Sequence, residues 1–306
     1  MHEFEEYYYQ QVRLLLRVLP FVAKQSCFAL KGGTAINLFV REMPRLSVDI
    51  DLVYLEKKSR EEAMLNIEKS LFLIKHDVEK YIPNVRVLIQ EHRHHKTAIK
   101  LFIIANHVQI KIEVNDVVRG VLIPVEYKRL CSSAENLFGL SVLDMPVVSH
   151  EDLYAGKICA ALDRQHPRDL FDVKLLLENE GVSTDLLSAI VVYIACGGRP
   201  IHELLNPNFL DLSKTYAKEF SGMTNMEITY HDLDTTRKTL VNLVKTKISR
   251  KDKEFLLSVN ASQPDWEFMD FDLKNFPALS WKIKNIQKMS SEKYVKMQKN
   301  LEAVFG

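Results

Sequence analysis

The chain has 306 residues, enough for one large domain or two modest ones. Its hydrophobic content of 47% and charged content of 26% are those of an ordinary soluble globular protein. The net charge of +1 excludes an overall basic footprint, so any contact with nucleic acid must come from a local patch.

The sequence carries no pattern of secretion or membrane insertion. Its first ten residues, MHEFEEYYYQ, are acidic and aromatic, and no apolar run reaches the length of a membrane span. The four cysteines are scattered without a Cys-x-x-Cys pair, which argues against a zinc site or a disulfide framework. We therefore expect a cytoplasmic protein without a membrane partner.

Helical and strand patterns alternate over the first quarter of the chain. Apolar residues at helical spacing predict a helix over 4–19, which Pro20 should end. The elements expected next are a strand over 26–30, a Gly-Gly turn, a helix over 34–40, a strand over 48–55 and an amphipathic helix over 59–74.

Three strand-forming runs follow, over 85–92, 97–105 and 108–116. The connections between them are short, so we expect antiparallel neighbours. The connection His92-Arg93-His94-His95 is interpreted as a solvated loop rather than a metal site, because its arginine and the adjacent Lys96 would repel a cation.

The second half of the chain is predicted to be almost entirely helical from Ser149 onward. The fold class is therefore α+β: a mixed or antiparallel sheet with flanking helices over 1–148, followed by a helical domain over 149–306. A C-terminal helix over 278–306 would carry six lysines and two glutamates. These lysines form either a solvated face or a patch for a phosphate backbone.

Asp49 and Asp51 lie one residue apart in the predicted strand 48–55. Side chains at positions i and i+2 of a strand project from the same face, so the two carboxylates stand side by side while Ile50 points into a core. Adjacent anions repel each other unless a positive charge lies between them, and hard divalent cations prefer carboxylate oxygens. The pair therefore indicates a metal site.

Glu113 supplies a third carboxylate. Alternation in the predicted strand 108–116 places Lys111 and Glu113 on one face. On a strand beside Asp49 and Asp51, this glutamate would complete a cage for one or two Mg²⁺ or Mn²⁺ ions. Such ions would hold the triphosphate of an NTP, neutralise charge that develops on the α-phosphate and activate an attacking hydroxyl.

The Gly-Gly turn, the Asp-hydrophobic-Asp strand and the later acid together resemble the DNA polymerase β-type nucleotidyltransferase superfamily. Within it, the chain resembles the AbiEii/AbiGii toxin family, the toxin components of bacterial type IV toxin–antitoxin and phage-abortive systems. The residues that carry this resemblance are Lys31-Gly32-Gly33-Thr34, Arg45-x-Ser47, Asp49-Ile50-Asp51-Leu52, Lys157, Arg168-Asp169-Leu170-Phe171-Asp172 and the segments 252–266 and 276–289. They span most of the chain.

The resemblance implies a polymerase β-like core and a set of site residues. Gly32 and Gly33 would let the backbone approach the triphosphate, and Thr34 would begin a helix whose N–H groups favour an anion. The residues implied are Asp49, Asp51, Lys157 and Asp172 as catalytic groups, Gly32, Gly33, Thr34, Arg45, Ser47 and Lys157 as nucleotide-binding groups, and Asp49, Asp51 and Glu113 as metal ligands.

The resemblance also distinguishes the residues of the last motif. Lys157 would supply a positive charge for the phosphates, and Asp172 would orient either Lys157 or the nucleotide. Asp169 lies near the start of a helix after Pro167, where exposed N–H groups favour a carboxylate. We therefore assign Asp169 a structural role and leave the functional role to Asp172.

The leading hypothesis is a metal-dependent toxin that transfers a nucleoside monophosphate from an NTP to an acceptor. The resemblance implies the 3′ end of tRNA as acceptor, a block of translation and growth, and a cognate antitoxin encoded nearby. Two alternatives stay open: the same chemistry on a protein or small-molecule hydroxyl, and a non-catalytic nucleotide-binding regulator. Ser47 should face the same site as Asp49, so we expect Ser47→Asp to lower activity.

Overall fold

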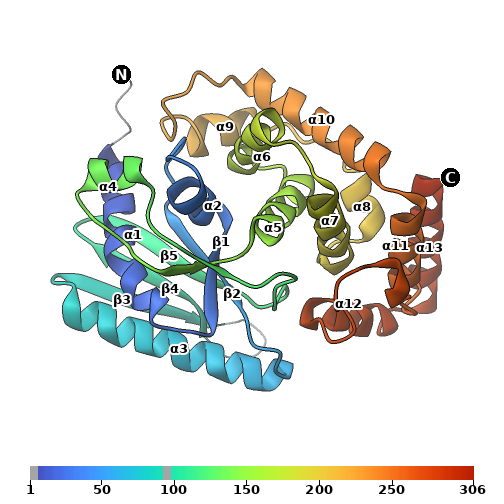
Figure 1. The fold of residues 1–306 in the computed structure, drawn as a ribbon, viewed down its shortest axis with the longest axis horizontal. Helices are drawn as coiled ribbons and strands as arrows, with labels where there is room; N and C mark the ends of the chain where they lie inside the picture. Colours follow the sequence, from blue (N-terminus) through green and yellow to red (C-terminus); the bar gives the residue numbers. More distant parts are fainter. Residues whose placement is uncertain (1–5, 92–97) are drawn as a thin grey trace. The chain divides into compact units, whose positions relative to one another are not determined.

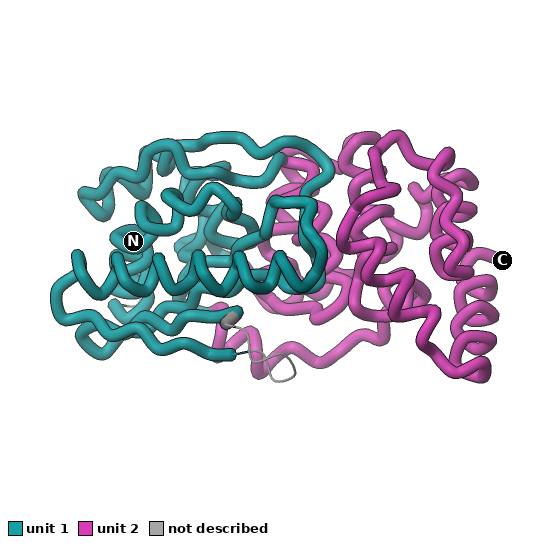
Figure 2. Tube along the Cα trace, turned by 90° about the horizontal axis from the view of Figure 1, so that it is seen from below, with its two compact units in different colours: residues 1–149, 221–227 teal, residues 150–220, 228–306 magenta. Residues whose placement is uncertain are grey.

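The computed structural model describes residues 6–91 and 98–306, and these fall into two units (Figure 2). Unit 1 comprises the described residues of 1–149 and 221–227, and unit 2 comprises 150–220 and 228–306. The loop predicted at His92-Arg93-His94-His95 lies outside the described residues.

Unit 1 includes a segment that the predicted domains, 1–148 and 149–306, did not assign to it. Residues 221–227 lie far along the chain but bind the irregular segment that precedes Asp49. The Leu46 amide donates to the Met223 carbonyl oxygen at 2.7 Å, and Thr224 Oγ1 donates to the Pro44 carbonyl oxygen at 2.7 Å.

A seven-stranded mixed sheet forms the centre of unit 1, in the order β3-β4-β5-β2-β1-β7-β6 (Figure 1). Its strands are β1 (Phe28–Lys31), β2 (Asp49–Tyr54), β3 (Val85–Glu91), β4 (Ala98–Ala105), β5 (Val108–Asn115), β6 (Glu126–Lys128) and β7 (Met145–Val147). The predicted antiparallel pairing of β3 with β4 and of β4 with β5 is confirmed. By contrast, β2 pairs with β5 in parallel, and so does β1 with β7.

The sheet has an apolar and a polar face where β3, β4 and β5 lie side by side. Ile103 and Ile112 are fully buried on one face, whereas Lys111 and Glu113 on the other are partly exposed. Two helices pack on the apolar face: α3 (Arg60–Tyr81) contacts β3 and β4, and α1 (Glu6–Ala23) contacts β5. The polar face is therefore the one that carries the predicted acids.

Helix α1 continues past Pro20, so the prediction that this proline ends the helix was wrong. Proline removes one amide donor and crowds the preceding turn, but here only one further turn follows it. Val22 in that turn is 1% exposed, so its burial favours helical continuation to Ala23.

Helix α3 is longer than the predicted 59–74 and ends at Tyr81. Ser59 and Glu62 form a capping box that fixes its start. The buried stripe continues through Ile74 and Val78, which extends the helix by almost two turns. Three short elements were not predicted because they are too short to show a period: β6, β7 and α4 (Ser132–Phe138).

Unit 2 is helical, as expected, and the α+β prediction is confirmed. Its elements are α5 (His150–Asp163), α6 (Pro167–Asn179), α7 (Thr184–Cys196), α8 (Ile201–Leu205), α9 (Ser213–Glu219), α10 (Tyr230–Lys247), α11 (Arg250–Asn260), the 3₁₀ turn η2 (Trp266–Phe268), α12 (Pro277–Gln287) and α13 (Ser291–Phe305).

The predicted single helix over 278–306 is instead two helices, α12 and α13. The chain leaves the helix after Gln287 and restarts with Ser290 as the N-terminal flanking residue of α13. Lys282 is only 9% exposed and therefore does not belong to a solvated lysine face. The prediction of six equivalent lysines was wrong in that respect.

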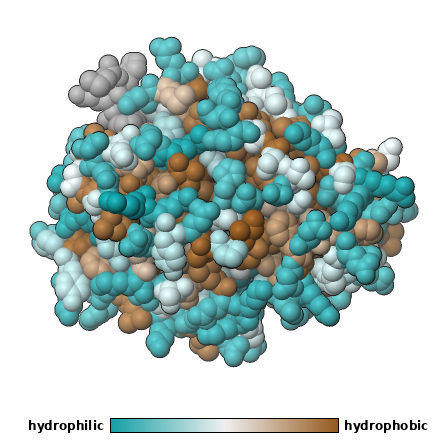
Figure 3. Space-filling view, viewed as in Figure 1, coloured by the Kyte–Doolittle hydropathy of each residue, from teal (hydrophilic) through white to brown (hydrophobic). Residues whose placement is uncertain are grey.

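No helix in the described part of the chain is long and apolar enough to cross a membrane. Large apolar side chains reach the surface at scattered positions, among them Leu65 and Phe72 on α3, which are 63% and 49% exposed. On the face drawn in Figure 3, apolar residues are interspersed among hydrophilic ones.

Candidate active site

The Gly-Gly turn directly follows β1 and leaves no room for side chains. Gly32 has a φ of +72°, and a Cβ atom there would lie 2.5 Å from Asp51 Oδ2. A Cβ atom on Gly33 would lie 2.7 Å from Arg45 Nη2 and 2.8 Å from Ser47 Oγ. Glycine at both positions therefore allows the backbone to lie directly against the strand that carries the acids.

A short helical segment starts at this turn, as α2 (Gly32–Ala35) followed by one turn of π-helix, η1 (Ile36–Val40). The helix begins at Gly32, two residues before the predicted start at Thr34. The Thr34 side chain is fully buried: Oγ1 donates to the Asp49 carbonyl oxygen at 2.5 Å and lies 3.0 Å from Ser47 Oγ. This side chain connects the turn to β2 rather than facing solvent.

Arg45 and Ser47 lie in the same buried layer behind the turn. Arg45 is 2% exposed and donates to the Leu46 carbonyl oxygen at 2.8 Å, and Ser47 is 6% exposed. Both side chains approach Gly33 from one side. The structure thus brings the predicted Gly-Gly, Thr34, Arg45 and Ser47 residues together beside Asp49.

The three predicted acids share one face of the sheet in adjacent positions of its register. Asp49 pairs with Lys111, and Asp51 pairs with Glu113, across the parallel β2 and β5 strands. Neighbouring strands are about 4.8 Å apart, so side chains at paired positions are close enough to act on the same ligand. On the other side of Asp51, β1 places Lys31 opposite it. We call Asp49, Asp51 and Glu113 the acidic row.

Glu113 is bound by two lysines. Its carboxylate oxygens lie 2.7 Å from Lys100 Nζ and 2.7 Å from Lys111 Nζ. Burial opposes ionisation of Glu113, but hydrogen bonds and charge from the two lysines lower the pKa of this carboxyl group. Burial also opposes the charged form of Lys111, but Glu113 and then the charges of Asp49 and Asp51 raise the pKa of Lys111.

Lys100 was missed by the sequence analysis. Its position opposite Glu113 depends on the antiparallel register of β4 with β5. Alternation within the strand could have placed Lys100 on a polar face, but only the pairing register shows which residue it meets.

The donor set of the acidic row fits a hard divalent cation. Within residues 6–91 and 98–306, no three His, Cys, Asp or Glu side chains form a preassembled metal site. The carboxylates of Asp49 and Asp51 nevertheless project from one face, and carboxylate oxygens are the ligands that Mg²⁺ and Mn²⁺ prefer. Glu113 could join them only by exchanging its lysine partners.

A second charged cluster lies in unit 2, between α5 and α6. Lys157 Nζ lies 2.8 Å from Asp169 Oδ1 and 3.0 Å from Asp172 Oδ2. Lys157 is 6% exposed, and both aspartates are at most 1% exposed. The structure therefore brings the predicted Lys157 and Asp172 together in one buried ion-paired cluster.

Asp169 belongs to the same cluster. Arg164 Nε donates to Asp169 Oδ2 at 2.6 Å, and sequence reasoning missed this arginine. Burial alone would raise the pKa of Asp169, but the charges of Lys157 and Arg164 hold that pKa far below its usual value. Both aspartates thus bind Lys157. These contacts do not separate a structural role for Asp169 from a functional role for Asp172.

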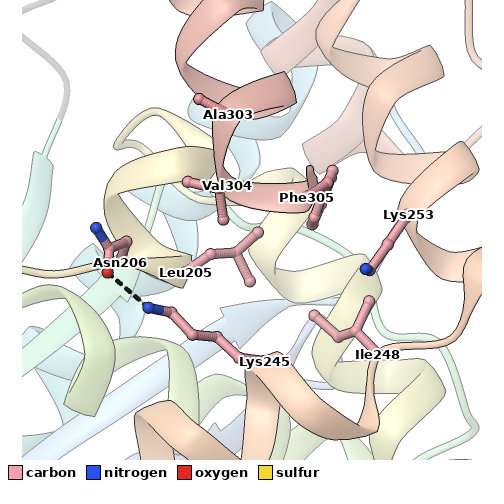
Figure 4. A pocket seen from close by; sticks show the side chains of 8 residues that line it. All are labelled: Leu205, Asn206, Lys245, Ile248, Lys253, Ala303, Val304 and Phe305. Carbon is pink, nitrogen blue, oxygen red and sulfur yellow. Dashed lines mark hydrogen bonds between the residues drawn. The ribbon is translucent and has the colours of Figure 1, made fainter.

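One cavity of about 220 Å³ lies in unit 2 among α8, α10, α11 and α13 (Figure 4). Its wall combines apolar and polar side chains, with Lys245 bound to Asn206 Oδ1 at 2.6 Å and Lys253 lying over the Phe305 ring. It contains none of the predicted site residues.

Comparison with known proteins relates the chain to one family. A family model described as nucleotidyl transferase AbiEii toxin, type IV TA system, matches residues 13–280. Among solved structures, the chain is similar to MenT4, a nucleotidyltransferase toxin from Mycobacterium tuberculosis H37Rv, with 12% identity and a TM-score of 0.61. That match covers 99% of this chain and 96% of the other, and it shows a shared fold. No curated protein matches.

Proposed function

Because the chain belongs to the AbiEii family of type IV toxin–antitoxin nucleotidyltransferases, it is a nucleotidyltransferase toxin, and we propose that its acceptor is the 3′ end of tRNA. Modification of that end would block aminoacylation and therefore growth. A cognate antitoxin encoded nearby would be the partner that restrains the toxin, and the reaction would take place in the cytoplasm.

The observation that carries this proposal is the acidic row beside the Gly-Gly turn. Asp49 and Asp51 share a face with Glu113, and the absence of a side chain at Gly32 leaves the backbone against Asp51. A triphosphate can approach such a backbone closely, while the acids lie where charge changes during phosphoryl transfer. This arrangement supports an NTP as donor.

The proposed reaction is an in-line displacement at the α-phosphorus of the NTP. The acceptor hydroxyl loses its proton and its oxygen forms a bond to phosphorus, while the bond to the β-phosphate breaks and pyrophosphate leaves. Lys157, held in position by Asp169 and Asp172, would contribute positive charge to the phosphates.

Asp49, Asp51 and Glu113 are the residues that would hold Mg²⁺ or Mn²⁺. Such an ion, when bound, would neutralise triphosphate charge and lower the pKa of the attacking hydroxyl. The protein's own contribution is to hold the three acids on one face, and the hydrogen bonds and charges of Lys100 and Lys111 lower the pKa of Glu113.

The direct test is label transfer from each of the four NTPs to total tRNA in the presence of Mg²⁺. We expect one or more nucleotides to be added at the tRNA 3′ end. Asp49→Asn and Asp51→Asn keep the side-chain shape but remove the negative charge. Each should lower the rate at least about a hundredfold, as expected when a group that stabilises transition-state charge is lost.

Glu61→Gln is the matched control, because this acid is exposed on α3 and outside the acidic row. It should retain full activity. Label that appears on protein or small molecules but not on RNA would refute the tRNA acceptor, and full toxicity of Asp49→Asn would refute a catalytic role for the row. Tight NTP binding without any turnover would favour a non-catalytic regulator.

A further inference from the structure

The polar face of the sheet continues past the acidic row to the edge strand β3. The register joins Asp49 to Lys111 on β5, Lys111 to Phe102 on β4, and Phe102 to Leu88 on β3. Successive strands are about 4.8 Å apart, so Phe102 lies about 10 Å from Asp49, measured across two strand spacings. An aromatic ring and the catalytic acids thus lie on one continuous surface.

This surface remains partly open to solvent in unit 1. Leu88 is 38% exposed, and Phe102 and Ile104 are only half-buried, whereas the alternate residues on β4 are buried. The helices that contact these strands, α1 and α3, pack on the opposite, apolar face. A half-buried aromatic side chain flanked by aliphatic ones therefore lies on the same face as the acids.

Basic and amide side chains surround the aromatic ring. In the neighbouring register positions, Arg86 pairs with Ile104, and Lys100 lies between Gln90 and Glu113. Outside Asp49 and Asp51, this part of the face carries three basic residues against two acids, Glu113 and Glu91, so its net charge is +1. The three basic residues are Arg86, Lys100 and Lys111.

We propose that this surface is a platform for the single-stranded end of the RNA acceptor, an inference that rests on the function proposed above. A base stacks on Phe102, while Arg86 and Lys100 contact phosphates on either side of it. A sheet that presents an aromatic ring beside basic residues provides both of the interactions that single-stranded nucleic acid requires. We call this surface the acceptor platform and define it as Arg86, Leu88, Lys100, Phe102 and Ile104.

The charge of the surface favours RNA over a protein partner. A predominantly apolar protein interface would be depleted of charged residues at its centre. Here Lys100 and Lys111 lie beside Phe102 in the register, and each retains N–H donors beyond its contact with Glu113. The platform also leads directly to the acids, as an acceptor strand must if its terminal hydroxyl is to react.

The test compares Phe102→Ala and Phe102→Trp in the full-length protein, with tRNA as acceptor. Loss of one base stack should raise KM for tRNA about tenfold while kcat changes little, and tryptophan should restore KM because it keeps the stacking surface. Calorimetry with NTP alone and thermal melting establish that each variant is folded and binds the donor. Leu65→Ala is the control, because it truncates an exposed apolar residue on α3.

A second measurement locates the RNA directly. tRNA with a photoreactive uridine near its 3′ end is crosslinked to the unmodified protein, and mass spectrometry identifies the attached peptides. Crosslinks in 85–91 or 98–105 would support the platform. If RNA is labelled but the crosslinks fall elsewhere and Phe102→Ala keeps its KM, the platform is refuted while the proposed function stands.

Two further outcomes are equally decisive. If the unmodified protein neither labels nor crosslinks to RNA, both the assignment of tRNA as acceptor and the acceptor platform are refuted. If Phe102→Ala leaves KM for tRNA unchanged but prevents neutralisation by the antitoxin, the surface binds protein and the RNA platform is refuted.

Discussion

Ser47 and Thr34 connect the Gly-Gly turn to β2 at the level of single residues. Their hydroxyl oxygens are 3.0 Å apart, and Ser47 is only 6% exposed. Arg45 Nη2 and Ser47 Oγ both lie where a side chain on Gly33 would extend. A charge introduced at position 47 would therefore lie inside this layer, beside Asp49.

Replacing Ser47 by Asp should weaken NTP binding and turnover. A phosphate bound at Asp49 would lie about 7 Å from a carboxylate at position 47, because positions two residues apart in an extended chain are that far apart. At an effective dielectric constant of about 20, these like charges would repel by about 2.4 kcal/mol, or about fiftyfold in NTP affinity. Titration calorimetry with NTP and the rate of label transfer measure the two effects.

Ser47→Ala is the matched control for Ser47→Asp, because it removes the hydroxyl contact with Thr34 without adding charge. We expect it to lose at most about 1 kcal/mol of stability and to bind NTP almost normally. Equal NTP affinity of the Asp and Ala variants would contradict the placement of Ser47 beside the triphosphate.

The sequence was sufficient to place some of these residues but not others. Asp49 and Asp51 share a face because of the two-residue period of a strand, which is a local property. Lys100 and Arg164 meet their carboxylates through strand register and helix packing, which a single sequence does not determine. Ion-pair partners outside the helix or strand that carries the carboxylate were therefore the residues that were missed.

Lys282 attaches α12 to the turn between α7 and α8. Its Nζ donates to the Gly197 carbonyl oxygen at 2.6 Å and to the Arg199 carbonyl oxygen at 2.7 Å. Burial lowers the pKa of this lysine from 10.5 to about 8. The contact between these elements thus depends on a buried ammonium group.

The free energy of unfolding should rise with pH through Lys282. Below pH 8 the lysine is protonated in both states and the cost of burying its charge is fully present. Between about pH 8 and 10.5 only the unfolded state keeps the proton. The free energy of unfolding should therefore rise by about 2 kcal/mol between pH 7 and 9.5. Urea unfolding at both pH values measures the change.

Lys282→Met removes the titrating group. Over this pH range, the free energy of unfolding of the variant should rise by about 2 kcal/mol less than that of the unmodified protein. Lys284→Met on the same helix is the control, because Lys284 is exposed. Its pH dependence should match that of the unmodified protein. An identical pH dependence for Lys282→Met would show that Lys282 stays protonated in this range.

At the scale of helices and strands, periodicity located most elements but not their ends. Pro20 did not end α1, because burial of Val22 outweighed the local preference of proline. The C-terminal pattern over 278–306 looked continuous because lysines and apolar residues keep a helical spacing across the break before Ser290. Where tertiary packing competes with local preference, helix ends could not be predicted from sequence.

At the scale of the whole molecule, the chain enters unit 1 a second time at 221–227. Residues 221–227 support the irregular segment that leads to Asp49, because Met223 and Thr224 bond to Leu46 and Pro44. Thr224 and Pro44 are 180 residues apart in sequence. Contacts at such separation leave no periodic signal, so a linear domain boundary was all that the sequence could suggest.

Thr224→Val should loosen the irregular segment before Asp49 and, through it, the Arg45–Ser47 layer. The variant loses the hydrogen bond from Oγ1 to the Pro44 carbonyl oxygen, worth about 1 kcal/mol, so hydrogen exchange at the Leu46 amide should accelerate about fivefold. NTP affinity should fall in parallel, because Arg45 and Ser47 pack against the Gly-Gly turn. Thr246→Val is the control, since it removes a similar bond to the Asn242 carbonyl oxygen on exposed α10. If Leu46 exchanges equally fast in both variants, residues 221–227 do not support the nucleotide site.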